Sequence, residues 1–212
     1  MKGSKIKKLK IKDFVMIALL TALYMLFYMV ASLFVFVLGD FGHAISPGIC
    51  GLLSGAVLVF MTRKVGKFGQ FTIMQAICMV IFSIMGAGYL PWFITSMVGA
   101  ILADIIASTT DKPATWKVGI ASGLFHVGQA FGTIIPCLFF LESYREEWIS
   151  RGQTEEAMDA MIKYTSGAMG IVSTIIVFTL SFIGVYIGYA ILKKHLENSE
   201  ASKVEKEAEA IS

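Results

Sequence analysis

Residues 14–38 read FVMIALLTALYMLFYMVASLFVFVL, a run of 25 residues without a charged side chain. A helix of about 20 apolar residues crosses the hydrocarbon of a bilayer, because each residue adds about 1.5 Å. The lysines before this run resemble the start of a secretory signal peptide, but the apolar part of such a peptide has only about 7–15 residues. We therefore expect a retained membrane helix here.

The rest of the chain continues in the same way. Of its 212 residues, 56% are hydrophobic, and the mean hydropathy of +0.74 is too high for a soluble domain. The apolar segments lack the alternation of barrel strands, and backbone groups in lipid must be satisfied within the segment. We predict an all-α membrane protein, a six-helix bundle with a basic segment 1–13 before it and a charged tail 193–212 after it. The predicted spans are 14–38, 46–62, 71–88, 92–108, 118–141 and 167–192.

Basic residues are distributed very unevenly around these segments. Fifteen of the 18 Lys and Arg residues fall on one side: Lys2, Lys5, Lys7, Lys8, Lys10, Lys12, Arg63, Lys64, Lys67, Lys112, Lys117, Lys193, Lys194, Lys203 and Lys206. Cytoplasmic loops retain Lys and Arg during insertion, so both termini are predicted to lie in the cytoplasm, with the chain passing repeatedly through the plasma membrane. The basic residues follow this topology and form no separate patch, so we expect no nucleic-acid partner.

The fifth predicted span carries a polar stripe. Ser122, His126, Gln129 and Thr133 follow at i, i+4, i+7 and i+11, a spacing that places them on one helical face. Polar side chains at this depth face a bundle interior or a cavity, so the stripe is either an interhelical hydrogen-bond seam or part of a substrate pocket. Burial would keep His126 neutral.

The loops on the less basic side complete the predicted substrate site. Interfacial aromatics are either membrane-belt residues or surfaces on which a flat ligand stacks. In the longest of these loops, 142–166, Thr154 followed by Glu155 and Glu156 predicts a short surface helix. The predicted substrate-binding residues are His126 and Gln129 as anchors, Thr133 nearer the mouth, Tyr89 and Trp92 as stacking or gating aromatics, and Asp40 and His43 on a lid loop.

Asp104 is the only acidic residue within the six predicted spans, and it lies about one turn from the cytoplasmic end of the span 92–108. We favour a structural role, at the interface or beside a basic residue, over proton coupling, for which a more central carboxylate would be expected.

Small residues recur at helix-packing spacing. The pairs are Ala18/Ala22, Gly51/Gly55 and Gly184/Gly188, together with the stripe of Ser96, Gly99, Ala103 and Ala107. Small residues let membrane helices approach closely. For most of these pairs we expect packing within the bundle, and we expect the first span to be the best candidate for docking onto another membrane protein.

Enzyme motifs are weak or absent. The chain contains no Walker A, H-E-x-x-H or G-x-S-x-G sequence. Residues 146–151 match the E-E-x-x-x-R motif of intramembrane proteases, but the F-x-x-x-H that such proteases need is missing, since Gly39 and Ser122 stand four residues before His43 and His126. Three cysteines lie in apolar spans without ligand spacing. We expect no enzyme activity, no metal and no cofactor.

The combination of six spans, both termini inside, about 200 residues and Ala18-x-x-x-Ala22 resembles the substrate-binding S components of energy-coupling factor (ECF) transporters. Lys12-Asp13-Phe14, the run from Ala18 to Tyr24 and the later Pro47-Gly48 are similar to the MptD/Trep_Strep group of these proteins. The resemblance covers residues 10–195. A third small residue would be expected four positions after Ala22, where this chain has Leu26.

The resemblance implies a bacterial importer subunit. Such a subunit captures a vitamin-like or other micronutrient outside the cell and docks through its first helix, here Ala18 and Ala22, onto a transmembrane T component. Two cytoplasmic ATPases drive release inside. The alternatives are a stand-alone secondary transporter and a non-transport membrane scaffold.

Overall fold

The computed structural model describes residues 8–108 and 113–209, and its described elements are all helices. Residues 1–7, 109–112 and 210–212, with Lys2, Lys5, Lys7 and Lys112, lie outside the described residues. The all-α prediction is confirmed. The helices are α1 (Ile11–Lys64), α2 (Gln70–Ile84), α3 (Leu90–Ala107), α4 (Thr115–Phe139), α5 (Leu141–Ser150), α6 (Glu155–Thr165) and α7 (Gly167–Glu209).

Helix α1 consists of two helices joined by a kink at Gly39, where φ is 61° and ψ is −146°. This positive φ favours glycine, the residue without a Cβ. Beyond the kink the chain is helical at once, so the prediction that Asp40 and His43 lie on a lid loop is wrong: both lie on a helix. Pro47 has no N–H for the carbonyl of His43, and the hydroxyl of Ser46 donates to that carbonyl instead, at 2.9 Å.

Among the described residues, five helical segments are long and apolar enough to cross a membrane: Ile11–Val35, Val37–Lys64, Leu90–Ala107, Thr115–Phe139 and Gly167–Lys194. The sixth apolar helix, α2, has 15 residues. At about 1.5 Å per residue it is roughly 22 Å long, which is less than the ~30 Å hydrocarbon core. The predicted span 71–88 therefore corresponds to a helix that ends at Ile84, before Gly86 with its φ of 80°.

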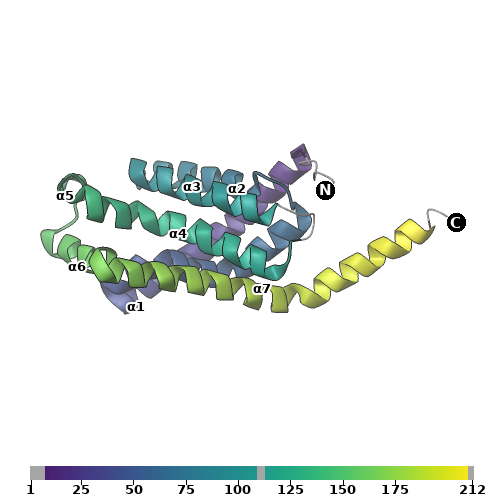
Figure 1. Ribbon diagram of the computed structural model, residues 1–212. Coiled ribbons are helices and arrows are strands. Elements are labelled where there is room, and N and C mark those ends of the chain that lie inside the picture. The colour runs from purple at the N-terminus through teal and green to yellow at the C-terminus, as the bar shows by residue number, and fades with distance from the viewer. Residues whose placement is uncertain (1–7, 109–112, 210–212) are drawn as a thin grey trace.

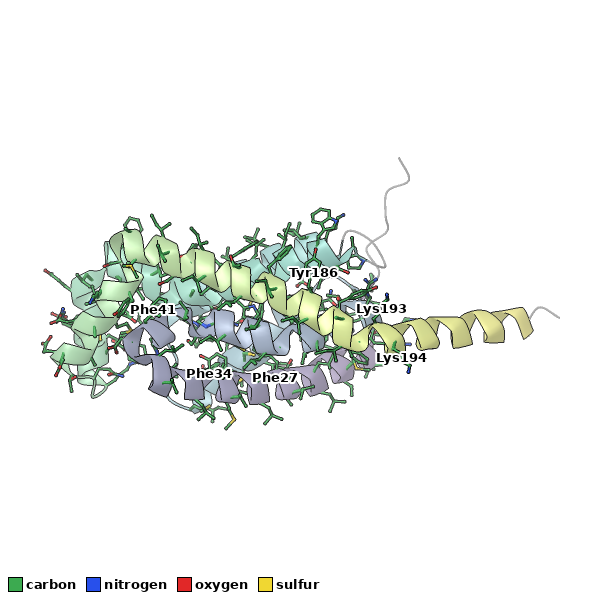
Figure 2. All side chains as sticks on the ribbon, turned by 90° about the horizontal axis from the view of Figure 1, so that it is seen from below. Phe27, Phe34, Phe41, Tyr186, Lys193 and Lys194 are labelled. Atoms are coloured by element: carbon green, nitrogen blue, oxygen red, sulfur yellow. The ribbon has the colours of Figure 1, made fainter. Side chains whose placement is uncertain are left out.

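The two ends of the bundle differ in character. The start of α1 and the end of α7 lie at one end, and α5 and α6 lie at the other (Figure 1). Lys193 and Lys194 mark the first end, whereas Phe41 lies near α5 and α6 (Figure 2). In the 142–166 region, the predicted surface helix is α6, where the Thr154 side chain accepts from the backbone N–H of Ala157 at 3.2 Å. A second short helix, α5, precedes it.

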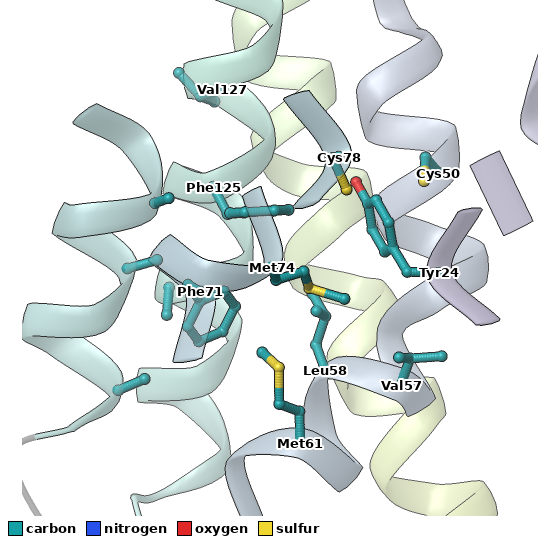
Figure 3. Close-up of a cluster of buried hydrophobic side chains, with 14 of the residues drawn as sticks. Tyr24, Cys50, Val57, Leu58, Met61, Phe71, Met74, Cys78, Phe125 and Val127 are labelled. Carbon is teal, nitrogen blue, oxygen red and sulfur yellow. The ribbon is translucent and has the colours of Figure 1, made fainter. Parts of the chain in front are cut away.

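The second half of α1 and the helix α4 form the centre of the bundle. In each of them 72% of the most apolar window is buried, against 28% in the first half of α1 and in α7. Phe71 and Met74 of α2 meet Phe125 of α4 in the core (Figure 3), and the Phe71 and Phe125 ring centroids are 5.6 Å apart.

Glycines bring the second half of α1 against α7. A Cβ on Gly55 would lie 1.9 Å from the carbonyl oxygen of Gly184, and a Cβ on Gly188 would lie 2.3 Å from the backbone nitrogen of Ala56. Gly99 of α3 and Gly128 of α4 approach each other in the same way. These small residues therefore pack within the bundle.

Asp104 caps a neighbouring helix. Its carboxylate accepts from the backbone N–H groups of Phe71 at 3.0 Å and Thr72 at 2.9 Å, and from the Thr72 hydroxyl at 2.7 Å. Gly69, at the N-cap of α2, has no side chain to serve the unpaired N–H groups of the first turn. An anion at a helix N-terminus is also favoured by the helix dipole. In the described part of the chain, the Asp104 carboxylate therefore stabilises the N-terminus of α2 through first-turn N–H groups and the Thr72 hydroxyl.

We expect Asp104→Ala to destabilise the bundle by about 1–2 kcal/mol, the loss typical of an N-cap carboxylate. The melting temperature of the purified protein should fall by roughly 3–8 °C. Asp40→Ala is the matched control, because Asp40 is exposed. An unchanged melting temperature with lost uptake would instead favour proton coupling through Asp104.

Candidate binding site

A cavity of about 190 Å³ opens toward the end of the bundle that carries α5 and α6. The second half of α1 contributes four consecutive or nearly consecutive residues to it, from His43 to Pro47, and α4 contributes a stretch from Gln129 to Thr133. Helices α2 and α3 with their connecting loop form another side. Tyr144 and Trp148 of α5 and Thr165 of α6 line it at this end of the bundle.

Five of the predicted substrate-binding residues line this one cavity: His43, Tyr89, Trp92, Gln129 and Thr133. The first and last of them in sequence, His43 and Thr133, are 90 residues apart. The structure thus brings together residues of the predicted outer loops and of the polar stripe, although His43 and Trp92 lie on helices. Whether they bind a substrate stays a prediction.

The other two predicted residues lie elsewhere. His126 is fully buried beneath the cavity, and it belongs to the same helix face as Gln129. Asp40 is exposed, directly after the kink of α1, and is not part of the cavity wall. The inner part of the polar stripe is therefore a hydrogen-bond seam, whereas its outer part faces the cavity.

The seam links three helices. The Tyr24 hydroxyl of α1 lies 3.2 Å from His126 Nε2 and 3.2 Å from Gln129 Nε2. Gln129 Nε2 also donates to Gln75 Oε1 of α2 at 2.9 Å. On the other side of the imidazole, His126 Nδ1 lies 2.8 Å from the carbonyl oxygen of Ser122. These contacts fix Gln129 at the base of the cavity.

Aromatic rings form much of the cavity wall. Trp92 meets Phe82 edge-on with 5.3 Å between ring centroids, and Tyr89 lies 5.5 Å from Tyr144 and 6.0 Å from Trp148. Gly132 of α4 makes room for Trp92, because a Cβ there would lie 2.4 Å from Trp92 Cδ1. Such a wall suits stacking on a flat, apolar ligand.

Helices α5 and α6 are held over the cavity by packing and by ion pairs. Tyr144 and Met158 are buried against each other's helices. Arg145 of α5 pairs with Glu155 and Asp159 of α6. Arg151 pairs with Glu147 and donates to the carbonyl oxygen of Gly88 at 2.9 Å, which ties α5 to the α2–α3 loop.

Among the described residues, no Lys, Arg, Asp or Glu side chain lines the cavity, although its wall includes the imidazole of His43. Burial raises the pKa of the Tyr144 phenol well above its ordinary value, and burial with the nearby Glu147 also raises the pKa of Tyr89. Both phenols are therefore neutral at physiological pH.

Within residues 8–108 and 113–209, no group of three or more His, Cys, Asp or Glu side chains could hold a metal ion. The E-E-x-x-x-R residues lie on α5, where Glu147 and Arg151 pair with each other.

Several wall residues were not among the predicted ones: Tyr28, Phe82, Tyr144, Trp148 and Thr165. Tyr144 and Trp148 stand four apart on a predicted outer loop, which is the spacing of one helical face and is the signal that could have found them. Tyr28 and Phe82 lie in apolar spans, where their sequence context does not separate them from lipid-facing aromatics.

A family model described as a hypothetical bacterial integral membrane protein (Trep_Strep) matches residues 11–198. No curated protein and no solved structure matches the chain.

Proposed function

Because the chain belongs to the Trep_Strep family of multi-pass bacterial integral membrane proteins, we propose that it is the substrate-binding (S) component of an ECF-type importer. In this role it would capture a small micronutrient outside the cell. It would then deliver the molecule through a T component energised by two ATPases.

The position of the cavity relative to the basic residues is the main support for this proposal. The cavity lies at the α5 and α6 end, whereas Arg63 and Lys64 end α1 and Lys117 lies in the first turn of α4. Lys193 and Lys194 lie at the same far end of the bundle, where α7 leaves it (Figure 2). By the positive-inside rule the basic end is cytoplasmic. The cavity would then face outward, which is the orientation that an uptake subunit needs for capture.

The first half of α1 supports a docking role. Ala18 and Ala22 are exposed on the bundle surface, unlike the glycine pairs of α1 and α7, which are covered. Leu19, Leu26 and Met29 are also exposed on this half, each by 59% or more. Small residues on an uncovered membrane face allow a second helix to approach closely.

Partner chains would hydrolyse the ATP, since this sequence contains no Walker A motif. A stand-alone secondary transporter would instead use an ion gradient. A transport-independent scaffold would need no substrate at all.

We expect the tagged chain to co-purify from its native membrane with one T component and two ATPases. Uptake of its substrate should stop when ATP is depleted and should survive collapse of the ion gradients. Recovery of the chain alone, with uptake that follows the ion gradient, would contradict the proposal and favour a secondary transporter. Recovery alone without any uptake would favour a scaffold.

A further inference from the structure

The hydrogen-bond direction of the buried seam follows from one backbone carbonyl. The carbonyl oxygen of Ser122 can only accept, so His126 Nδ1, 2.8 Å away, carries the hydrogen. In a neutral imidazole the other nitrogen, Nε2, is then an acceptor. Its neighbour at 3.2 Å is the Tyr24 hydroxyl, which must donate to it.

The direction continues through Tyr24 to Gln129. Having donated its hydrogen to His126, the Tyr24 oxygen accepts from Gln129 Nε2 at 3.2 Å. The second amide hydrogen of Gln129 goes to Gln75 Oε1 at 2.9 Å. In the opposite arrangement Tyr24 would donate to Gln129 Oε1 at 3.4 Å, a longer contact. It would also leave the fully buried Nε2 of His126 without a donor, which is costly.

Gln129 is therefore held with both amide hydrogens committed and with its Oε1 as the acceptor left over. Gln129 is also the member of the seam that lines the cavity. Two hydroxyls on the same wall are committed as donors: Ser46 donates to the carbonyl of His43, and Thr165 donates to the carbonyl of Met161. The hydrogen-bonding capacity that Gln129 has left for a ligand is therefore that of an acceptor.

Size and charge restrict the ligand further. At about 190 Å³ the cavity is smaller than the roughly 300–1,000 Å³ of sites for drug-sized ligands, which favours one or two rings. A charged ligand would lose its hydration in a wall without an opposite charge, and this loss is expensive. The aromatic wall formed by Phe82, Trp92 and Tyr89 favours a flat molecule.

We infer that the cavity selects an uncharged, flat heteroaromatic molecule that donates an N–H or O–H hydrogen bond to Gln129, with Tyr24 acting as the positioning residue that sets this preference. The inference deepens the proposed function and rests on it for the identity of the cavity as a substrate site. Binding to the purified chain needs no partner, so the two proposals can fail separately.

The test measures binding of matched probes to the full chain in lipid nanodiscs, by saturation-transfer NMR titration. The probes are indole and carbostyril, their N-methyl forms, which lack the donor, and their carboxylates, which carry a charge. We expect indole and carbostyril to bind about fivefold to tenfold more tightly than the N-methyl forms, the ratio that one hydrogen bond supplies. The carboxylates should bind at least as weakly as the N-methyl forms.

Three variants test which residues cause the preference for probes with an N–H donor. Gln129→Leu should reduce the ratio between the N–H and N-methyl probes to about one. Tyr24→Phe removes a single oxygen outside the cavity wall, and it should also lower the ratio, because the Gln129 amide is then free to turn. Thr21→Val is the control, because its buried hydroxyl donates to the carbonyl of Ile17 on the same helix and takes no part in the seam, so the preference should be retained. Tyr24→Phe keeps its ring in the core, so the test stands even where Gln129→Leu does not fold.

Equal binding of the N-methyl probes, tighter binding of the carboxylates, or no binding of any probe overturns the inference. A Tyr24→Phe variant with the full preference overturns the positioning role. If the preference is found but no partner co-purifies, the proposed importer function fails while the cavity chemistry stands. If partners and ATP-driven uptake are found with a charged substrate, the importer function stands while the inferred cavity chemistry fails.

Discussion

Gly55→Ala is expected to cost the bundle about 3 kcal/mol or more, the upper range for overpacking of a tight interface. The added Cβ would lie 1.9 Å from the carbonyl oxygen of Gly184 and 2.1 Å from its carbonyl carbon. Both are backbone atoms, so no side chain can turn aside, and α1 and α7 must move apart. The melting temperature in detergent should fall by roughly 10 °C.

Gly184→Ala tests the same interface from the other helix, because its Cβ would lie 2.3 Å from the carbonyl oxygen of Gly51. Once one methyl has separated the helices, the second meets less resistance. The double variant should therefore lose less than the sum of the two single variants. Gly88→Ala is the control, since its Cβ would find no atom closer than 3.5 Å. Equal losses in Gly88→Ala and Gly55→Ala would contradict the role of the helix contact, because Gly→Ala alone reduces the entropy of the unfolded chain and is not expected to destabilise where there is space.

The sequence predicts this interface only in part. The spacing of Gly51/Gly55 and Gly184/Gly188 predicts close packing, but not which pairs meet. That depends on the order of helices around the bundle, which hydropathy does not encode. Once the glycines are paired inside, Ala18 and Ala22 are left as the exposed pair.

The kink of α1 shows where local patterns mislead. Gly39 and the Ser46-Pro47-Gly48 sequence together indicate a loop. In the structure Gly39 alone absorbs the change of direction, and Ser46 supplies the hydrogen bond that Pro47 lacks. Asp40 and His43 therefore lie on a helix. On this helix His43 is part of the cavity wall, whereas Asp40 lies outside it.

The candidate site could be predicted where polar residues stand out from an apolar background. Gln129 and Thr133 are visible for this reason, and their spacing gives the face that they share. Tyr24 could not be predicted, because a tyrosine in an apolar span is also typical of the membrane interface. Its partners His126 and Gln129 are 102 and 105 residues away in the chain.

The double variant Ala18→Trp with Ala22→Trp is expected to fold and to keep the probe preference of the cavity, but to lose the proposed T component. Both side chains are exposed and lie apart from the cavity wall. Two indole rings on this face would hold a partner helix several Å away from the backbone of α1. Overpacking by even 1.4 kcal/mol corresponds to a tenfold loss of affinity, so recovery of the T component should fall at least about tenfold.

Leu23→Trp is the matched control for this docking test. Leu23 is 42% exposed on the same half of α1, but its direction from the helix axis differs from that of Ala18 by about 140°, given 100° per residue. A tryptophan there faces lipid without blocking the small-residue line, so association should be retained. Unchanged association of the Ala18/Ala22 variant would remove α1 from the interface and direct attention to the exposed face of α7 at Ile171 and Ile175. Loss of probe binding in the same variant would show that the first half of α1 shapes the cavity, and that its exposed face cannot be tested as a docking surface alone.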